Sequence, residues 1–505
     1  MCINIAIGRE ASTENQIMVC RNEDGRGHRW NRYLAYRSEP EYASPLVVHE
    51  GIWTLGNGLG VPLPANGFAY SAMPDAQPHR AARCHLHEGR GINENNVAVS
   101  TTNARRLNPQ AMAADPLLAE AGIEEAVIPT LLLPQALSAR HGVELLGHYI
   151  ERYGASEACG AILADAFEAW YLETGSAHHW IAVRIPADSY LVAAGAMRVH
   201  DVDLDGAGVL HSRGLFEFVA EHRLLADPDR RRFDFAGAFG VPGSPHDAER
   251  IWLTQKHLSS SQRQGPRQPR YPLFLKPDGR LCVTDVMTVL RGTSMWRVFE
   301  GGTGRPSAHD RTEASHIVCL NADMPTELRG LIWQTLGSPL GTPYLPLYHA
   351  MQDIPRELGR SSDPQGGTPA YRAFRGLLAL AGGETPGHLS ALQAMWHAQE
   401  QEFVFQQHHL RQMLLSMYLQ SPPSALAFAQ HYSTGCTLQM VEKAHRERQR
   451  LMAPPPGKDR QRVGGLRGTA NRAARLRPVE TQARRPISRP APQPVGITGL
   501  RPRTF

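Results

Sequence analysis

The spacing of hydrophobic residues at the start of the chain predicts two paired β-strands. Ile3, Ile5 and Ile7 alternate with smaller or polar residues at the period of a strand. The polar stretch 8–15 follows, and residues 16–20 form a second apolar run. Two such runs around a short polar connection are typical of an antiparallel hairpin. With the turn near the middle of the polar stretch, the numbers of paired residues sum to about 24.

This register gathers a thiol, a guanidinium and a carboxylate at one end of the hairpin. Cys2 lies beside Arg21 and Asn22, and Asp24 follows the end of the second strand. Because Cys2 is small, an aminopeptidase can remove Met1 and leave a free α-amine, which can act as base for the thiol of the same residue. Arg21 would favour the thiolate, and Asp24 could hold the ammonium or the arginine in place. We interpret Cys2 as a candidate nucleophile; the alternative is an ordinary start codon followed by a buried cysteine.

Farther along the chain, the hydrophobic pattern changes between the periods of helices and strands. Residues 107–153 have the period of amphipathic helices. Four short apolar runs predict a meander of strands at Ala161–Ala164, Glu168–Leu172, His179–Ile185 and Tyr190–Ala194. Two longer runs predict core strands at Ala314–Leu320 and Leu331–Leu336. Most of residues 375–450 is again helical, so the whole pattern predicts an α+β fold.

Two polar residues lie where a loop meets a regular element. Asn103 ends the predicted strand 97–103, and its amide could donate a hydrogen bond to a substrate carbonyl, although asparagine at a strand end is usually a turn former. Arg250 follows the loop 240–245. It could reach a pocket or form a surface ion pair, and the pattern leaves both alternatives open.

Composition and cysteine usage exclude several classes of protein. No stretch approaches the ~20 apolar residues of a membrane helix, and the start of the chain lacks the basic and apolar segments of a signal peptide. The seven cysteines are scattered, without a CxxC pair, so neither a disulfide framework nor a zinc site is expected. We therefore predict a cytoplasmic protein with no membrane contact, no metal and no cofactor.

The charge of the chain is unevenly distributed. The net charge is +5, but residues 451–505 carry a net +10, so the rest of the chain is near −5. This last segment is rich in Arg, Pro and Gly and has few large apolar residues, which predicts disorder. We expect a folded domain over residues 1–452, helical at about 375–452, and a disordered tail over 453–505. A basic tail can bind nucleic acid, but this one has no aromatic residue before Phe505, and we interpret it as a solvated extension.

Several sequence blocks, taken in their order and spacing, resemble those of the cysteine dipeptidases of the N-terminal-nucleophile (Ntn) hydrolase superfamily. The chain is also similar, more distantly, to choloylglycine hydrolases and penicillin V acylases. The resemblance extends over roughly residues 2–450. The blocks that carry it are MC at 1–2, RNEDG at 21–25, GINENNVAVSTTN at 91–103, ADPLLAEAGIEE at 114–125, SARHGVELLGHYIERYG at 138–154, AFEAWYLE at 166–173, HHWIAVRIP at 178–186 and RPSAHDRTEASHIV at 305–318.

The resemblance implies a fold and a set of roles. The family fold is a four-layer αββα sandwich. Cys2 would be the nucleophile and, through its α-amine, the base, while Arg21 and Asp24 match the family's RxxD and would tune and position that terminus. Asn103 lies ten residues after Asn93, the spacing at which the related acylases place an active-site asparagine.

Two further positions bear on substrate binding and on the oxyanion. Arg250 matches, by its spacing from the segment 240–243, a pocket arginine of the acylases. Gly195 stands where the family usually has an asparagine for the oxyanion. The loss of one such donor typically lowers the rate by about 10²–10³-fold. Either the backbone amide near Gly195 and another group replace it, or the activity is weak or redirected.

These expectations lead to one predicted function and two rivals. We expect a dipeptidase that hydrolyses a small peptide through an acyl-enzyme on Cys2. The first rival is a hydrolase that cleaves N-acyl compounds or other linear amides with the same residues. The second is a catalytically degenerate Ntn-fold binding protein whose basic tail recruits a partner. The sequence does not specify the preferred side chains or the oligomeric state.

Overall fold

The computed structural model describes most of the chain in detail. The described residues are 2–25, 33–38, 48–64, 66–74, 86–102, 106–266, 268–294, 312–360, 368–383 and 387–453. The chain divides into two units, residues 1–453 and residues 454–505, and the described residues all belong to the first unit. The predicted tail therefore lies outside the described residues.

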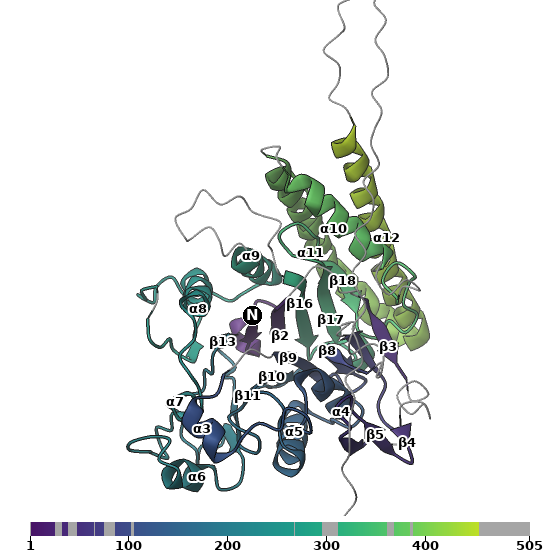
Figure 1. Ribbon diagram of the computed structural model, residues 1–505. Helices are drawn as coiled ribbons and strands as arrows, with labels where there is room; N and C mark the ends of the chain where they lie inside the picture. The colour runs from purple at the N-terminus through teal and green to yellow at the C-terminus, as the bar shows by residue number, and fades with distance from the viewer. Residues whose placement is uncertain are drawn as a thin grey trace, which may run out of the picture. The chain divides into compact units, whose positions relative to one another are not determined.

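A seven-stranded antiparallel sheet contains the N-terminal hairpin near its centre (Figure 1). Its strands, in spatial order, are β15 (Phe274–Leu275), β13 (Tyr190–Ala194), β1 (Ile3–Ile7), β2 (Gln16–Asp24), β16 (Thr312–Asn321), β17 (Gly330–Leu336) and β18 (Leu345–Tyr348). The predicted hairpin and the predicted core strands at 314–320 and 331–336 are all confirmed as parts of this sheet.

An eight-stranded sheet contains most of the strands from the middle of the chain. In spatial order they are β14 (Val209–His211), β12 (Trp180–Arg184), β11 (Ala169–Thr174), β10 (Gly160–Ala164), β9 (Ala98–Thr102), β8 (Glu88–Asn93), β7 (Tyr70–Pro74) and β3 (Ala35–Arg37). A small third sheet consists of β4 (Val48–His49), β5 (Ile52–Thr54) and β6 (Gly60–Pro62).

Helices occur between the strands and form the C-terminal part of the described chain. They are α3 (Pro109–Ala114), α4 (Ile128–Leu132), α5 (Ala139–Tyr153), α6 (Leu215–Glu221), α7 (Phe235–Phe239), α8 (Pro245–Leu258), α9 (Val283–Ser294), α10 (Pro369–Ala381), α11 (His388–Gln420) and α12 (Pro422–Met452). Short 3₁₀ turns occur at η1 (Arg9–Ala11), η2 (Glu125–Val127) and η4 (Thr326–Leu328). The three C-terminal helices confirm that this part of the domain is helical.

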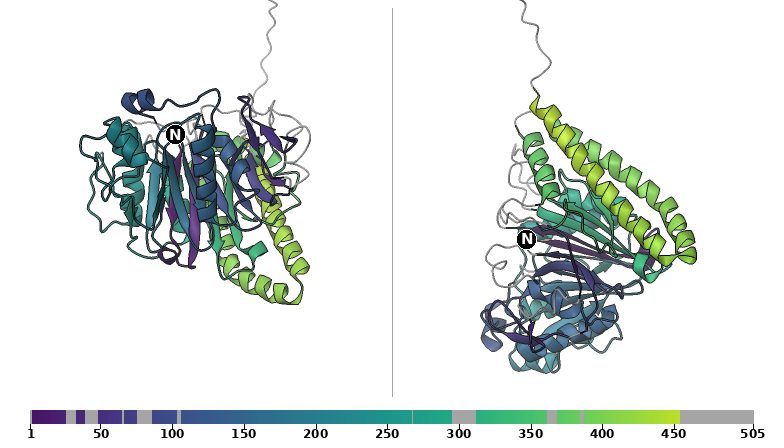
Figure 2. Two further views of the ribbon diagram at one scale, coloured as in Figure 1. Left: turned by 90° about the horizontal axis from the view of Figure 1, so that it is seen from below. Right: turned by 90° about the vertical axis from the view of Figure 1, so that its right-hand side faces the viewer.

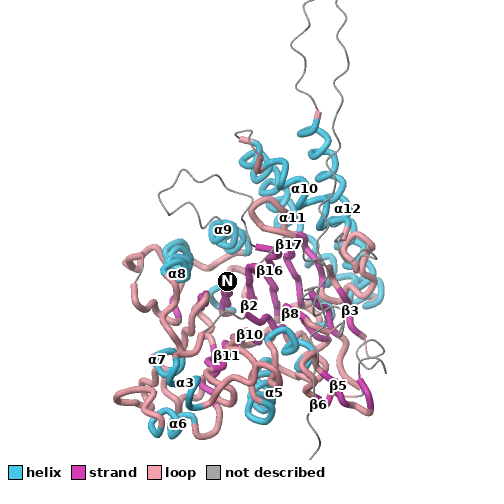
Figure 3. Tube along the Cα trace, in the orientation of Figure 1, coloured by secondary structure: helices cyan, strands magenta, loops and turns pink. Residues whose placement is uncertain are grey.

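The two large sheets pack face to face between two layers of helices, as Figure 2 shows from the side. Strand β2 contacts β9 and β10 across the interface between the sheets. Helices α8, α9, α10 and α12 pack on the seven-stranded sheet, and α4 and α5 pack on the eight-stranded sheet (Figure 3). The predicted α+β fold and its four-layer αββα arrangement are therefore confirmed.

This layering explains why the N-terminal hairpin is buried on both of its faces. Every residue of β1 is buried, polar Asn4 included, because helices cover one face of the strand and the second sheet covers the other. Gly8 begins the connection between the two strands, and a Cβ atom there would lie 2.4 Å from the carbonyl oxygen of Pro186. The hairpin is thus an interior element that fixes the position of Cys2 firmly.

One predicted strand pairing is wrong. Residues 160–199 do not form a single meander, because only β10, β11 and β12 are neighbours in the eight-stranded sheet. The fourth strand, β13, crosses to the other sheet and pairs with β1, with Ile3 opposite Ala194. The hydrophobic period identifies a strand but not its partner, so this crossing could not be predicted from the sequence pattern. Its consequence is that the end of β13 lies beside the start of β1.

Buried His349, just after β18, makes the stability of the fold depend on pH. Its Nε2 lies 3.4 Å from the carbonyl oxygen of Thr326, and burial lowers the pKa of the ring to about 4. The unfolded chain takes up a proton at about pH 6.5, which the folded chain does not, so stability falls as the pH drops from about 6.5 towards 4. Between pH 7 and pH 5 this histidine should lower the free energy of unfolding by about 2 kcal/mol. We expect His349→Gln to show a smaller loss of Tm between these pH values than the unchanged protein, and an equal loss would contradict this prediction.

We expect the first unit to be stable without the second. All the described helices, strands and buried residues lie before residue 454. Deletion of residues 454–505 should therefore leave the Tm and the catalytic activity unchanged, as thermal unfolding and a hydrolysis assay would show. A shortened chain that unfolds at a clearly lower temperature would contradict the proposed domain boundary.

Candidate active site

Cys2 and Arg21 are in direct contact in the interior of the protein. Arg21 Nη2 donates a hydrogen bond to Cys2 Sγ over 3.4 Å, and the two residues are each 4% exposed. The hairpin register differs by one residue from the predicted one, because Ile3 pairs with Asn22 and Asn4 pairs with Arg21. Continued by one residue, this register places Cys2 opposite Glu23, so that Arg21 lies two residues away on the same face. The contact between thiol and guanidinium depends on this corrected register.

Arg21 is held in place by groups from the second sheet. Its Nη1 donates to the carbonyl oxygen of Gly89 over 2.9 Å, and its Nη2 lies 3.7 Å from Glu125 Oε1. Glu125 is fixed in turn by the hydroxyl of Thr101, which donates to the same oxygen over 2.7 Å. Burial alone would lower the pKa of the Arg21 guanidinium. The nearby Cys2 and carboxylates together have the larger effect and hold the pKa of Arg21 above its usual range. Arg21 is therefore a fixed positive charge beside the sulfur.

Asp24 and Arg250 form a buried ion pair next to this contact. Asp24 is the last residue of β2, and its Oδ2 accepts a hydrogen bond from Arg250 Nη1 over 3.0 Å. Its Oδ1 accepts from the hydroxyl of Thr312 over 2.8 Å. The side chain of Arg250 is only 3% exposed, so the alternative of a surface ion pair is wrong. Two of the predicted site residues that are far apart in the sequence are thus brought together.

Helix α8 owes its position to a well-formed N-terminus. Ser244 is the N-cap residue, and its hydroxyl accepts a hydrogen bond from the backbone N–H of Asp247. The carboxylate of Asp247 accepts in return from the backbone N–H of Ser244, which completes a capping box, and Pro245 occupies the first turn. Arg250 lies three residues after Asp247 and therefore on nearly the same face of the helix.

Gly195 directly follows β13 and has a conformation that suits glycine. Its φ is +62°, in the left-handed region. A Cβ atom on this residue would lie 2.2 Å from Cγ of Asp247 and 2.3 Å from each of its carboxylate oxygens. An asparagine side chain, which the resemblance implies for this position, would therefore need Asp247 to move. The carboxylate of Asp247 occupies the space that this amide would take.

Asn103 lies outside the described residues; β9 ends one residue earlier, at Thr102. Its role at the site stays a prediction.

Sequence reasoning missed three residues that the structure places against predicted site residues. Gly89 and Glu125 contact Arg21, and Asp247 lies against Gly195. Glu125 belongs to the block at 114–125 that carried the family resemblance, so that block held a signal for it. Asp247 had no such signal, because a carboxylate three residues after a serine is typical of any capped helix.

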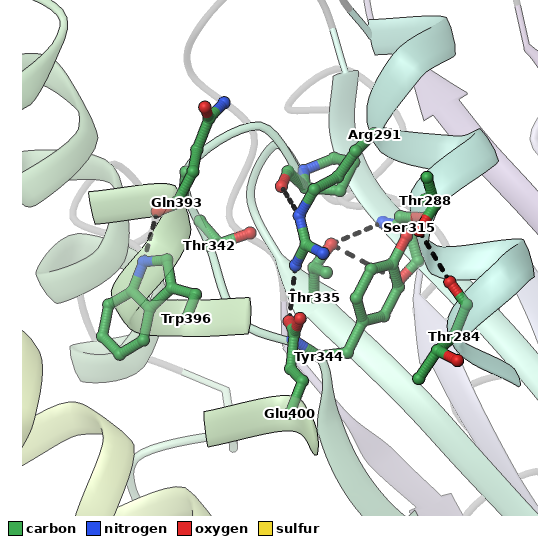
Figure 4. Close-up of polar contacts among 12 residues, drawn as sticks. Thr284, Thr288, Arg291, Ser315, Thr335, Thr342, Tyr344, Gln393, Trp396 and Glu400 are labelled. Carbon is green, nitrogen blue, oxygen red and sulfur yellow. Dashed lines mark hydrogen bonds and ion pairs between the residues drawn. The ribbon is translucent and has the colours of Figure 1, made fainter. Parts of the chain in front are cut away.

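A buried polar network connects helix α11 with Ser315 on β16 (Figure 4), and Ser315 contacts the backbone of Arg21. On α11, Glu400 Oε1 accepts hydrogen bonds from Arg291 Nη2 over 2.5 Å and from the backbone N–H of Tyr344 over 2.8 Å. The hydroxyl oxygens of Tyr344 and Ser315 are 2.7 Å apart, and Ser315 Oγ donates to the carbonyl oxygen of Arg21 over 3.2 Å. The helical layer thereby supports the strand that carries Arg21.

Searches of the described residues for two other kinds of feature find none. No group of three His, Cys, Asp or Glu side chains in the described ranges could hold a metal ion. Among the same residues, no helix has both the length and the apolar character to cross a membrane. The six cysteines within these ranges are free thiols.

Comparisons with known proteins find relatives by sequence and by structure. The model of peptidase family C69 matches residues 1–397. A probable dipeptidase of Salmonella dublin is 33% identical over 371 residues, which cover 70% of this chain and 81% of that protein. A probable dipeptidase of Latilactobacillus sakei is 31% identical over 367 residues, which cover 70% of this chain and 75% of that protein. Among solved structures, penicillin V acylase from Agrobacterium tumefaciens matches with a TM-score of 0.32 and 12% identity, over 71% of this chain and 89% of that chain.

Proposed function

The chain belongs to peptidase family C69, and we propose that it is a dipeptidase in which the thiolate of Cys2 attacks the peptide bond. The observation that carries this proposal is the contact between Arg21 Nη2 and Cys2 Sγ. A fixed guanidinium beside a thiol favours the thiolate, which is the reactive form of cysteine. A structural cysteine in a strand has no need of a buried positive charge that is itself held by a carbonyl oxygen and a carboxylate.

The proposed reaction begins with removal of Met1, which leaves Cys2 with a free α-amine. The amine accepts the thiol proton, and the thiolate attacks the carbonyl carbon of the peptide bond. The resulting ammonium donates this proton to the leaving amine, so that the C-terminal amino acid departs and the N-terminal residue remains on Cys2 as a thioester. Water, deprotonated by the same amine, then attacks the thioester, and the thiol leaves as it regains a proton. The cycle needs only a nucleophile, a base and donors for the oxyanion.

The ion pair of Asp24 and Arg250 supports this reaction by fixing the end of β2. Both side chains are largely shielded from water, so the loss of either would remove a strong electrostatic contact of the other. We propose that the pair positions the N-terminus of the processed chain and forms part of the pocket wall.

The oxyanion site differs from the one that the family resemblance implies. The space of an asparagine side chain at position 195 is occupied by the carboxylate of Asp247. We propose that the backbone N–H of Gly195 and the side chain of Asn103 supply the donors instead. Two donors suffice for substantial stabilisation, since each typically contributes about 10²–10³-fold to the rate.

A panel of substrates tests the choice of a dipeptide. The purified protein is incubated with free dipeptides, tripeptides, N-acyl amino acids and other linear amides, and the released amino acids are measured. We expect release from the dipeptides alone or far faster than from the rest. Cleavage of only the N-acyl compounds would instead support the rival acylase, and no cleavage at all would support the degenerate binding protein.

We also propose that the enzyme acts in the cytoplasm on small peptides. The free state of the six described cysteines is the state that a reducing compartment maintains. Cell fractionation followed by detection of the native protein tests this location, and recovery outside the cytoplasmic fraction would contradict it.

A further inference from the structure

We propose that Asp247 binds the free α-ammonium group of the substrate and so restricts the enzyme to peptides with an unblocked N-terminus. This inference rests on the proposed dipeptidase function, because it assigns one end of that substrate to a residue. The carboxylate of Asp247 is buried and only partly hydrogen-bonded. Asp247 is 1% exposed, and its Oδ1 has no hydrogen-bond partner.

The two oxygens of Asp247 are in very different surroundings. Oδ2 accepts hydrogen bonds from the hydroxyl of Ser244 over 2.6 Å and from its backbone N–H over 3.2 Å, as part of the capping box. Oδ1 is also buried but has no hydrogen-bond partner. Buried polar atoms are nearly always hydrogen-bonded, so an unpaired carboxylate oxygen calls for a donor that the unliganded chain lacks. A positively charged donor suits it best.

The pairing of two strands places the carboxylate near the end of the sheet at which Cys2 lies. The pairing of β1 with β13 ends with Ile3 opposite Ala194, so the residues next to this pair, Cys2 and Gly195, lie at the same end of the two strands. Asp247 lies directly on Gly195, where a Cβ atom would be 2.3 Å from Oδ1. Glycine at this position is what allows the carboxylate to approach the strand so closely. Figure 1 shows α8 next to β13 and the N-terminus.

The geometry of a dipeptide requires an ammonium site close to the sulfur. The attacking sulfur must come within about 3.5 Å of the scissile carbonyl carbon. In a dipeptide, a single carbon atom separates that carbonyl from the α-ammonium nitrogen. The group that binds the ammonium is therefore a close neighbour of Cys2, and Gly195 and Asp247 meet this requirement.

Other carboxylates at the site already have defined partners. Asp24 accepts from Arg250 and Thr312, and Glu125 accepts from Thr101 beside Arg21. Asp247 has one oxygen that is fixed and one that is unpaired, so it is rigidly placed and still able to accept. After removal of Met1, Cys2 has an α-ammonium group of its own, with the same chemistry as the α-ammonium of the substrate. The experiment must therefore show which of the two ammonium groups Asp247 binds.

Binding to an inactive background tests the proposal without depending on turnover. Cys2→Ala and the double variant Cys2→Ala, Asp247→Asn are titrated by calorimetry with alanyl-alanine and with N-acetyl-alanyl-alanine. Asparagine keeps the shape and can still cap the helix, but it loses the charge. We expect Cys2→Ala to bind the free dipeptide about 10- to 100-fold more tightly than the acetylated one, and the double variant to lose this difference. An equal preference in both proteins, or no binding of the free dipeptide, would overturn the proposal.

The same substitution in the active chain separates the two sources of ammonium. If Asp247 binds the substrate, Asp247→Asn should raise KM for free dipeptides by about 10- to 100-fold and leave the rate and pH profile of Cys2 alkylation by iodoacetamide unchanged. A changed alkylation profile with an unchanged KM would assign Asp247 to the Cys2 amine and overturn the proposal. The matched control is Asp234→Asn, since Asp234 caps α7 through Gly237 but has Arg270 as its charged partner. Asp234→Asn should change neither KM for free dipeptides nor the alkylation of Cys2. Failure of the proposed function itself would be seen in a different experiment, as dipeptide hydrolysis that survives Cys2→Ala.

Discussion

Replacing Cys2 by alanine is expected to lower kcat for dipeptide hydrolysis by about 10⁴-fold or more. The substitution removes the sulfur that forms the acyl-enzyme and leaves the α-amine and the rest of the site in place. Alanine fits the buried position, and the backbone pairing of β1 with β2 and β13 does not involve the thiol. Activity is measured as release of free amino acids, and folding is measured by circular dichroism and Tm. Undiminished hydrolysis by a folded Cys2→Ala variant would contradict the mechanism.

Cys20 provides a matched control for this substitution. It lies in the same hairpin, in β2, and is fully buried. Burial raises the pKa of its thiol well above the usual value, so this cysteine is an inert structural residue. We expect Cys20→Ala to retain kcat close to that of the unchanged protein, with a modest loss of Tm from the small cavity. Loss of activity in both variants at equal stability would show that the effect is not specific to Cys2.

Replacing Arg21 by glutamine is expected to have the second-largest effect on activity. Glutamine removes the positive charge beside Cys2 Sγ and the ion pair of Arg21 with Glu125. The loss of one preorganised electrostatic group typically lowers kcat by about 10²–10³-fold. Breaking a buried ion pair by removing one partner also lowers the free energy of unfolding, typically by about 3–5 kcal/mol. Both effects are measurable, by steady-state kinetics and by urea denaturation.

Arg90 serves as a control for the substitution of Arg21. It shows whether kcat falls because the positive charge beside Cys2 is lost or because any buried arginine is lost. It is also buried between the sheets, and its Nε and Nη2 donate to Gln334 Oε1 over 3.0 and 2.7 Å. Arg90→Gln should lose stability but keep most of its kcat. If Arg90→Gln and Arg21→Gln lose kcat to the same extent, the effect of Arg21 is structural and its role beside the thiolate is contradicted.

Local patterns in the sequence predicted those parts of the site that depend on one hairpin. The alternation of Ile3, Ile5 and Ile7 and the polar break after them predicted the hairpin, and with it that Cys2 and Arg21 lie at the same end of it. The register was wrong by one residue, since the position of a turn within a polar stretch is set by contacts such as that of Gly8 with Pro186. A shift of one residue reverses the face of every side chain, and here it decides whether Arg21 can reach the sulfur.

Long-range packing produced the parts that the sequence could not predict. The crossing of β13 to the first sheet, the burial of Arg250 and the approach of Asp247 to Gly195 each join segments that are far apart in the chain. The family resemblance identified Arg250 and the exceptional glycine, but it could not show that a carboxylate fills the space of the missing amide. The predicted dipeptidase family itself is confirmed by the family match and by the relatives.

Intact-mass spectrometry of enzyme quenched during turnover tests the central claim most directly. The claim is that Cys2, freed of Met1, carries the acyl group of a dipeptide. We predict a chain that begins at Cys2, with a transient increase in mass equal to one acyl residue that maps to the N-terminal peptide and is absent from Cys2→Ala. A fully active protein that retains Met1, or an adduct on a different residue, would contradict the account.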